Sequence, residues 1–303
     1  MARMNSAFST GDVDRSIGAI LIDSGRLAPE DAERILQFQR EAGLRFGEAG
    51  IKLGLLTEAD ILYALSLQFD YPFLSGPSRP VSDEVVVAYR PFGHEGERLR
   101  SLRSQLQLRW FDEGGKRSSL AIVGAHRYEG RSHLAANLAV SFAQAGERTL
   151  LIDADLRHAA QHHYFKLDNA TGLSNLLVGQ IHESSVKFVP GIPGLAVLPS
   201  GPLPPNPQEL LSRPSFMRML DQSISSFSVV IIDTPAIEEG IDASLVARGA
   251  GAALAVARTN LTRTRDFNEV VNIVSDTGAR VVGSVLIDVP LNKRRKHGRV
   301  QLV

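Results

Sequence analysis

The sequence predicts an α/β protein: a mostly parallel sheet with helices on both faces, preceded by a small, mainly helical domain. Short apolar runs at 120–125, 149–153 and 228–233 alternate with helical stretches, which is the pattern of parallel strands buried on both faces. Residues 120–157 read as strand, turn at Gly130, helix and second strand, which is a βαβ unit. An internal repeat near the N-terminus predicts the helical domain.

The composition is that of an ordinary globular protein, with enough apolar residues for a full core in one or two domains. Of the 303 residues, 44% are hydrophobic and 22% are charged. The formal net charge is zero, so no overall field favours nucleic acid, and we expect no nucleic-acid partner. The chain has no cysteine, which excludes disulfides and thiolate chemistry and fits a reducing cytoplasm. We find no signal peptide and no apolar run long enough for a transmembrane helix.

The N-terminal domain is expected at 15–70, after a disordered stretch at 1–14. Residues 16–39 align with residues 45–68 without a gap, and each copy reads as a short helix, a glycine stop and a second helix. Thr57 with Asp60 is a plausible N-cap pair for the last of these helices, the equivalent of a capping box. The identical positions are Gly18/Gly47, Ile22/Ile51, Gly25/Gly54, Leu27/Leu56, Asp31/Asp60, Leu36/Leu65 and Gln39/Gln68.

A proline-rich stretch at 71–94 reads as a linker, and a helix begins after it. On that helix Glu97, Arg100 and Arg103 recur every third residue, so they lie on one side. Two interpretations stay open for them. They form a solvated charged face, or they form a self-association surface that exchanges Glu–Arg pairs between subunits.

The turn of the βαβ unit is a degraded Walker A loop. Walker A requires G-x-x-x-x-G-K-[ST], whereas this chain has Ala125, four residues, Gly130, Arg131 and Ser132. Alanine replaces the first glycine, although Gly124 stands next to that place, and arginine replaces the lysine. The loop either binds phosphate at a helix N-terminus or is kept only as a strand–helix turn.

Carboxylates follow two of the predicted strands at the same edge of the sheet. Asp153 and Asp155 end the second strand of the βαβ unit, and Asp233 follows the apolar run VVII, which is the Walker B form. Carboxylate oxygens and the hydroxyl of Ser132 suit Mg²⁺. Farther along, the basic tail at 291–303 reads as a solvated end or as a segment attracted to anionic lipid or to a phosphorylated partner.

Residues 95–290 resemble the bacterial tyrosine kinases (BY-kinases), specifically the chain-length-determinant tyrosine kinases of the EpsG type from exopolysaccharide loci. The motifs that carry the resemblance occur in the family's order: ERLRSLRSQL, YEGRS, LLIDADLR, GLSNLL, SGPLPPNPQELL, VVIIDTPA and VARTNLT. The repeat at 15–70 resembles the N-terminal domain of type II secretion and pilus assembly ATPases, some of which bind cyclic di-GMP there.

The resemblance implies a role for each candidate residue. ATP would be held by Ala125, Glu129, Gly130, Arg131, Ser132 and His133, and Mg²⁺ by Ser132, Asp155 and Asp233. Asp153, Asp155 and Arg131 would be catalytic, with Asp153 a candidate to orient or deprotonate the acceptor tyrosine. Glu97, Arg100 and Arg103 would build a homo-oligomer. The partner would be the cytoplasmic segment of a membrane polysaccharide co-polymerase, which would hold this cytoplasmic protein at the inner membrane.

Three departures from the family pattern leave other functions open. Arg131 replaces lysine, Tyr128 replaces a glycine of the loop, and the C-terminal tyrosine cluster of the family is missing. The alternative is therefore a catalytically weak, nucleotide-dependent assembly factor, responsive to cyclic di-GMP. A partitioning ATPase ranks third, because His126 stands where those proteins carry an extra lysine.

Overall fold

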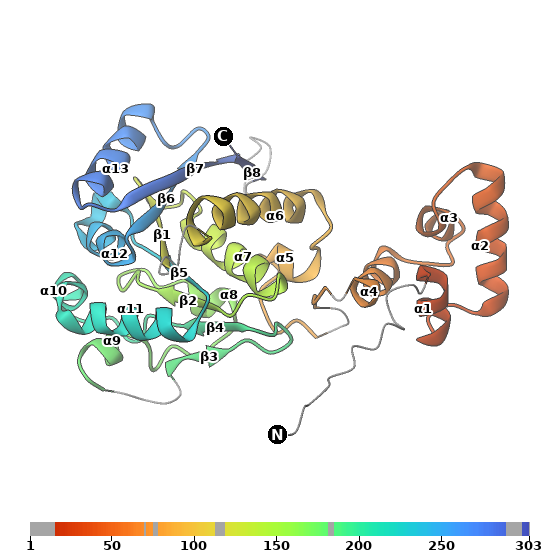
Figure 1. The fold of residues 1–303 in the computed structure, drawn as a ribbon, viewed down its shortest axis with the longest axis horizontal. Coiled ribbons are helices and arrows are strands. Elements are labelled where there is room, and N and C mark those ends of the chain that lie inside the picture. The colour runs from red at the N-terminus through yellow and green to blue at the C-terminus, as the bar shows by residue number, and fades with distance from the viewer. Residues whose placement is uncertain are drawn as a thin grey trace, which may run out of the picture. The chain divides into compact units, whose positions relative to one another are not determined.

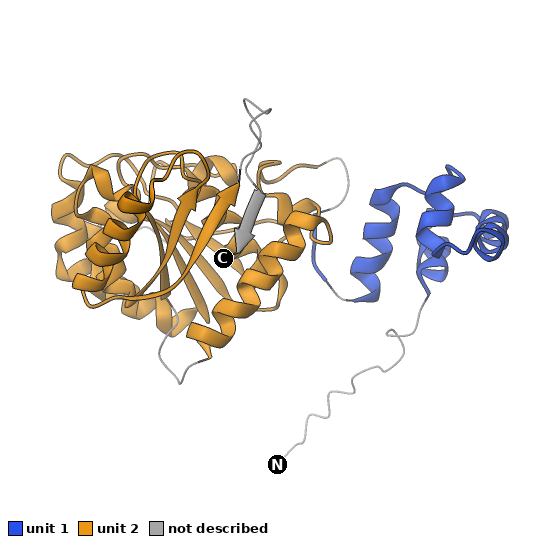
Figure 2. Cartoon of the chain, turned by 90° about the horizontal axis from the view of Figure 1, so that it is seen from above, with its two compact units in different colours: residues 1–75 blue, residues 76–303 orange. Residues whose placement is uncertain are grey.

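The computed structural model describes residues 16–69, 71–74, 78–112, 119–180, 185–288 and 299–302. The chain forms two compact units, residues 1–75 and 76–303, which Figure 2 shows in different colours. The predicted disordered stretch at 1–14 lies outside the described residues. Among the described residues, no helix is long and apolar enough to cross a membrane.

The first unit consists of four helices that match the repeat. They are α1 (Ile17–Asp23), α2 (Pro29–Ala42), α3 (Phe46–Lys52) and α4 (Glu58–Gln68). Gly25 and Gly54, equivalent in the two copies, both adopt a φ of 68°, which ends the first helix of each pair in the left-handed region. Thr57 and Asp60 form the capping box expected from the sequence: the Asp60 N–H donates to Thr57 Oγ1, and the Thr57 N–H to Asp60 Oδ2.

The packing of the core of this unit accounts for Gly50, a glycine that the two copies of the repeat do not share. The core consists of Ile20, Leu21, Leu27, Ala32, Ile35, Ala49, Leu56 and Ala64. The ungapped alignment of the two copies places Gly50 opposite Leu21, but a Cβ at Gly50 would lie 2.5 Å from Leu56 Cδ1 and 3.1 Å from Ile35 Cδ1. A larger side chain at this position would therefore displace the side chains of Leu56 and Ile35, so glycine favours the close packing of the core.

The second unit is built on one eight-stranded sheet of order β3-β4-β2-β5-β1-β6-β7-β8. The strands are β1 (Ser119–Gly124), β2 (Thr149–Asp153), β3 (Lys187–Phe188), β4 (Leu195–Leu198), β5 (Val229–Asp233), β6 (Ala252–Arg258), β7 (Arg280–Asp288) and β8 (Arg299–Leu302). The inner strands are parallel, and only the outermost pairs, β3–β4 and β7–β8, are antiparallel. Every residue of β1, β2 and β5 is buried, as the apolar runs predict.

Helices cover both faces of this sheet (Figure 1), which confirms the predicted P-loop NTPase-type fold. Helix α7 contacts β1, β2 and β5, whereas α12 and α13 contact β1, β6 and β7. The helices are α5 (Val86–Tyr89), α6 (His94–Leu106), η1 (Gln107–Phe111), α7 (Arg131–Gln144), α8 (Gln161–Tyr164), α9 (Leu173–Leu177), α10 (Pro207–Ser212), α11 (Pro214–Ser226), η3 (Ile237–Glu239), α12 (Asp242–Ala250) and α13 (Thr264–Asp276).

Two segments differ from the expectation. Part of the predicted linker at 71–94 belongs to the second unit, because helix α5 packs on α7 and the Val87 N–H donates to buried Asn137. The predicted solvated tail at 291–303 ends in β8, which pairs with β7; residues 289–298 lie outside the described part. The apolar runs in the sequence identify the inner strands. The edge strands β3, which has two residues, and β8, which is polar and follows basic residues, contain no such run.

Candidate active site

The carboxyl ends of three neighbouring parallel strands meet at one edge of the sheet. Strand β1 leads into the loop at 125–130, β2 ends at Asp153, and β5 ends at Asp233. The register pairs Asp153 directly with Asp233. This is the edge at which open α/β sheets bind their ligands, and the N-terminus of α7 lies there as well.

The loop keeps the close packing of a phosphate-binding turn although its first Walker glycine is alanine. Gly130 caps α7 with a φ of 93°, and a Cβ there would lie 2.7 Å from Ile287 Cδ1. At Gly124 a Cβ would lie 2.4 Å from Glu129 Oε2. The close approach that excludes a side chain thus occurs at Gly124, and Ala125 is accommodated as a buried residue.

Arg131 is bound to oxygens of the protein at the base of the loop. Its Nε donates to the Thr234 carbonyl (3.1 Å), and its Nη1 donates to the His126 carbonyl (2.6 Å) and lies 3.5 Å from Glu129 Oε2. Glu129 is fully buried and also accepts from Thr262 Oγ1 (2.5 Å). Arg131 therefore joins the loop to the end of β5, with Glu129 as its counter-ion; phosphate contacts of both residues stay predictions.

Asp153 and Asp233 form a pair of fully buried carboxyl groups. Burial, and then the charge of Asp233, raise the pKa of Asp153 well above its ordinary value. Burial raises the pKa of Asp233 to about 6, although hydrogen bonds from the Gln161 and Ser132 side chains lower it. Asp153 also accepts the backbone N–H groups of Asp155, Ala160 and Gln161, which fixes its orientation. A raised pKa suits a carboxylate that must take up a proton.

The surroundings of Asp233 fit a divalent cation. Its Oδ2 accepts from Gln161 Nε2 (2.8 Å), whereas its buried Oδ1 has no hydrogen-bond partner among the described residues. Ser132 stands beside it in the first turn of α7. A buried carboxylate oxygen with an open position next to a hydroxyl is a donor set that Mg²⁺ accepts. Gln161, which orders this carboxylate, belongs to no motif and was missed from the sequence.

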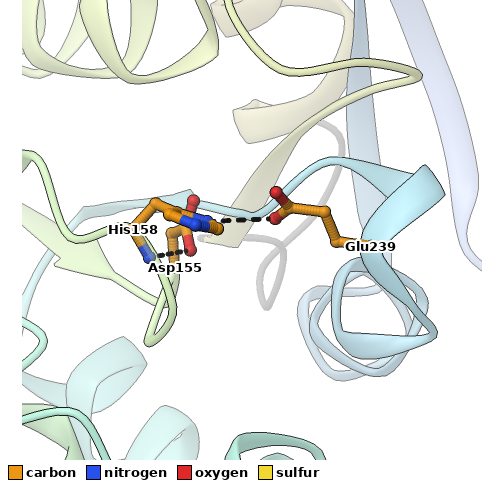
Figure 3. A group of neighbouring side chains, drawn as sticks. All are labelled: Asp155, His158 and Glu239. Carbon is orange, nitrogen blue, oxygen red and sulfur yellow. Dashed lines mark hydrogen bonds and ion pairs between the residues drawn. The ribbon is translucent and has the colours of Figure 1, made fainter.

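Asp155 lies in a second group with His158 and Glu239 (Figure 3). Their possible ligand atoms all lie within 4.8 Å of one another, and His158 Nδ1 is 3.3 Å from Glu239 Oε2. The backbone N–H groups of Arg157 and His158 donate to Asp155 Oδ1. The predicted metal ligands Ser132 and Asp233 thus meet beside the Asp153 carboxyl group, whereas Asp155 points to a group that includes His158 and Glu239, which sequence patterns did not single out.

The outer side of the loop is held by a histidine between two acids. His126 Nδ1 lies 2.6 Å from Glu238 Oε2, and its Nε2 lies 3.0 Å from Asp266 Oδ2. Glu238 also accepts the Arg127 N–H (2.9 Å). Hydrogen bonding to Asp266 and then to Glu238 raises the pKa of His126, and His126 lowers the pKa of both acids. These contacts, which we call the His126 clasp, tie the loop to η3 and α13.

The remaining predicted site residues lie on α7 and α6. His133, in the first turn of α7, is buried, with its ring edge toward Tyr164 at 6.3 Å between centroids. On α6, Arg100 pairs with Glu97 and with the Pro91 carbonyl, and Arg103 donates to the Ser141 carbonyl of α7 (3.0 Å). Contacts within one chain therefore engage both arginines, and their role between subunits stays a prediction.

The fold and this edge define an α/β nucleotide-binding protein of the P-loop class. No family model matches the sequence. The chain is, however, 31% identical over 214 residues to the tyrosine-protein kinase YwqD of Bacillus subtilis. The aligned residues make up 71% of this chain and 90% of YwqD. It is 35% identical over 209 residues to the tyrosine-protein kinase Ptk of Acinetobacter johnsonii, covering 69% of this chain but only 27% of Ptk. The chain belongs to the bacterial tyrosine-protein kinases, which are ATP-dependent.

Solved structures agree with this assignment. The chimerical protein CapA2B2 superposes with a TM-score of 0.64 at 32% identity, over 75% of this chain and 97% of that one. The kinase domain of the Escherichia coli tyrosine kinase ETK superposes with a TM-score of 0.65 at 29% identity, over 70% and 83%. Both superpositions support the tyrosine-kinase fold.

Proposed function

We propose that the chain is a protein-tyrosine kinase that regulates exopolysaccharide polymerisation, export and chain length together with a membrane co-polymerase. The observation that carries the proposal is the Asp153–Asp233 pair beside the phosphate loop, in a member of the tyrosine-kinase family. The polysaccharide role is supported by the resemblance of the motifs at 95–290 to the EpsG type. In this proposal the protein is cytoplasmic and reaches the inner membrane through its partner.

In this mechanism the backbone N–H groups at the start of α7 bind the phosphates of ATP, since they carry the positive end of the helix dipole. Ser132 and Asp233, with Asp155 close by, would hold Mg²⁺, which when bound neutralises negative charge on the phosphates. Asp153 orients the acceptor tyrosine and takes its proton, because burial and Asp233 raise its pKa. Arg131 stabilises the loop and supplies positive charge next to the transferred group.

A nucleotide-dependent assembly factor is the alternative. Two observations favour it: the guanidinium of Arg131 is already bound by protein oxygens, and the chain has no tyrosine after Tyr164. Cyclic di-GMP binding by the helical repeat would belong to this alternative. In that repeat Arg45 lies at the N-cap of α3, where its backbone N–H donates to Glu48.

Incubation with labelled ATP, Mg²⁺ and the cytoplasmic segment of the co-polymerase tests the proposal. We expect phosphotyrosine to form with the wild-type chain and to be lost in Asp153→Asn, which keeps the shape of the buried side chain. A chain that binds ATP and oligomerises without labelling any tyrosine would support the assembly factor and contradict the kinase proposal.

A further inference from the structure

The chain contains five tyrosines, and all of them lie in the described part of the structure. Tyr128 is 74% exposed, whereas Tyr89 is buried and the other three are partly buried. The ring of Tyr63 lies under the Arg26 guanidinium at 4.1 Å, and burial raises the pKa of Tyr164. Tyr128 is therefore the side chain that a second kinase molecule can reach most easily.

Tyr128 occupies a place in the phosphate loop that does not suit its side chain. Its φ is 64°, in the left-handed region that costs a non-glycine residue roughly 1 kcal/mol. The Tyr128 carbonyl accepts from Arg258 Nη1 (2.5 Å), which fixes this conformation. Glycine would fit this backbone without strain, so packing and backbone geometry do not explain the tyrosine; such an outlier is a reason to look for a function.

We propose that Tyr128 is a phosphoryl acceptor, modified in trans by a second copy of this chain. The proposal rests on the proposed kinase function. The Tyr128 Oη–phosphorus bond forms, the bond between the γ-phosphorus and the β,γ-bridging oxygen of ATP breaks, ADP leaves, and Asp153 of the other copy takes the phenol proton. The Tyr128 ring is exposed to solvent, so the active site of a second copy can approach it.

Two arginines lie beside Tyr128, and both already have partners within the chain. The Arg127 guanidinium carbon lies 5.2 Å from the centre of the Tyr128 ring and its Nε lies 3.5 Å from Glu239 Oε1, whereas Arg258 Nη1 donates to the Tyr128 carbonyl. A phosphate on Tyr128 would add a charge of about −1.5 to −2 at the entrance of the nucleotide site. We therefore expect the modification to weaken ATP binding by like-charge repulsion, so that the reaction limits itself.

The trans reaction is tested with an acceptor that cannot act as a kinase. The wild-type chain, lengthened by a tag, is the donor, and the full chain carrying Asp233→Asn is the acceptor, with labelled ATP and Mg²⁺. Two further acceptors carry Asp233→Asn with Tyr128→Phe, or with Tyr63→Phe as the matched control. A tyrosine-containing copolymer reports the activity of the donor, and mass spectrometry maps phosphate on the wild-type chain alone.

We expect label in the first acceptor and in the Tyr63→Phe control, loss of most of it with Tyr128→Phe, and phosphate mapped to Tyr128. Labelled copolymer without phosphate on Tyr128, or label that survives Tyr128→Phe, overturns the proposal and leaves the kinase function standing. If neither the copolymer nor the acceptor is labelled, both the proposal and the kinase function fail.

The regulatory consequence is measured by titrating ATP into the phosphorylated chain and into the same sample after phosphatase treatment. Weaker ATP binding by the phosphorylated sample supports a self-limiting reaction. Equal or tighter binding by the phosphorylated chain contradicts it.

Discussion

Asp233 combines two features that point to a bound ligand. Its side chain is fully buried, and one of its carboxylate oxygens has no hydrogen-bond partner among the described residues. A carboxyl whose pKa is higher in the folded than in the unfolded chain stabilises the fold below its unfolded pKa, near 3.8. That contribution is lost as pH rises through the folded pKa of about 6. The free chain therefore carries a destabilising charge at neutral pH, which a bound cation would offset.

We predict that Asp233→Asn raises the melting temperature at pH 8 in the absence of divalent cations, and raises it about half as much at pH 5, which lies between the unfolded and folded pKa values. A rise in pKa from 3.8 to about 6 limits the effect to about 3 kcal/mol. Thermal unfolding at both pH values measures it, with the exposed Asp221→Asn as the control. An equal change at the two pH values would show that the buried charge is not the cause.

At the residue scale, motif spacing located Asp153, Asp155, Asp233 and Ser132, because strand ends and helix starts are visible in a sequence. It did not locate Gln161, which reaches Asp233 from a short helix eight residues after Asp153. A single buried amide has no periodicity or spacing that distinguishes it from a surface glutamine.

Among the elements, the phosphate loop shows where motif reading is incomplete. In the Walker A pattern, Ala125 and Arg131 are departures from the expected glycine and lysine. In the structure, however, the tight contact that excludes a side chain occurs at Gly124, and the buried Glu129 is the counter-ion of Arg131. These compensations involve contacts with Thr234, directly after β5, and with Thr262, both far from the loop in sequence. Local pattern therefore predicted the loop but not the partners that hold it.

The His126 clasp leads to a prediction about pH. Because its pKa is raised in the folded chain, His126 adds stability below its unfolded pKa, near 6.5, and this contribution disappears as pH rises through the folded value. We expect His126→Asn to lower the melting temperature more at pH 6 than at pH 9. The exposed His94→Asn serves as the control, and a loss independent of pH would mean that the clasp acts without its charge.

For the whole molecule, the apolar runs and the repeat predicted the inner strands and the four-helix unit, since both depend on local periodicity. The edge strands β3 and β8 were missed because each has neighbours on one side only and needs no continuous apolar run. The packing of α5 against α7 was also missed, because the proline-rich stretch before α6 looks like a linker in the sequence.

Self-association is tested best at Glu97, whose side chain is 68% exposed. Arg103 is a poorer choice because its substitution would also break the contact with the Ser141 carbonyl. If α6 is the surface between subunits, Glu97→Arg should lower the mass measured by light scattering with little change in melting temperature. Glu269→Arg, on exposed α13 surface, is the matched charge reversal. An unchanged mass would leave α6 as a solvated face.

The central claim is that this arginine-containing loop binds ATP, and calorimetric titration with Mg²⁺-ATP tests it most directly. Removing a charge-assisted contact of about 1.5–3 kcal/mol should make Arg131→Ala bind roughly 10- to 100-fold more weakly. Arg131→Lys keeps the charge and should keep binding. Arg131 is buried with three protein partners, so melting temperatures of both variants identify any loss due to unfolding. A folded Arg131→Ala variant that binds ATP as tightly as the wild type, or a wild type that binds none, would contradict the account.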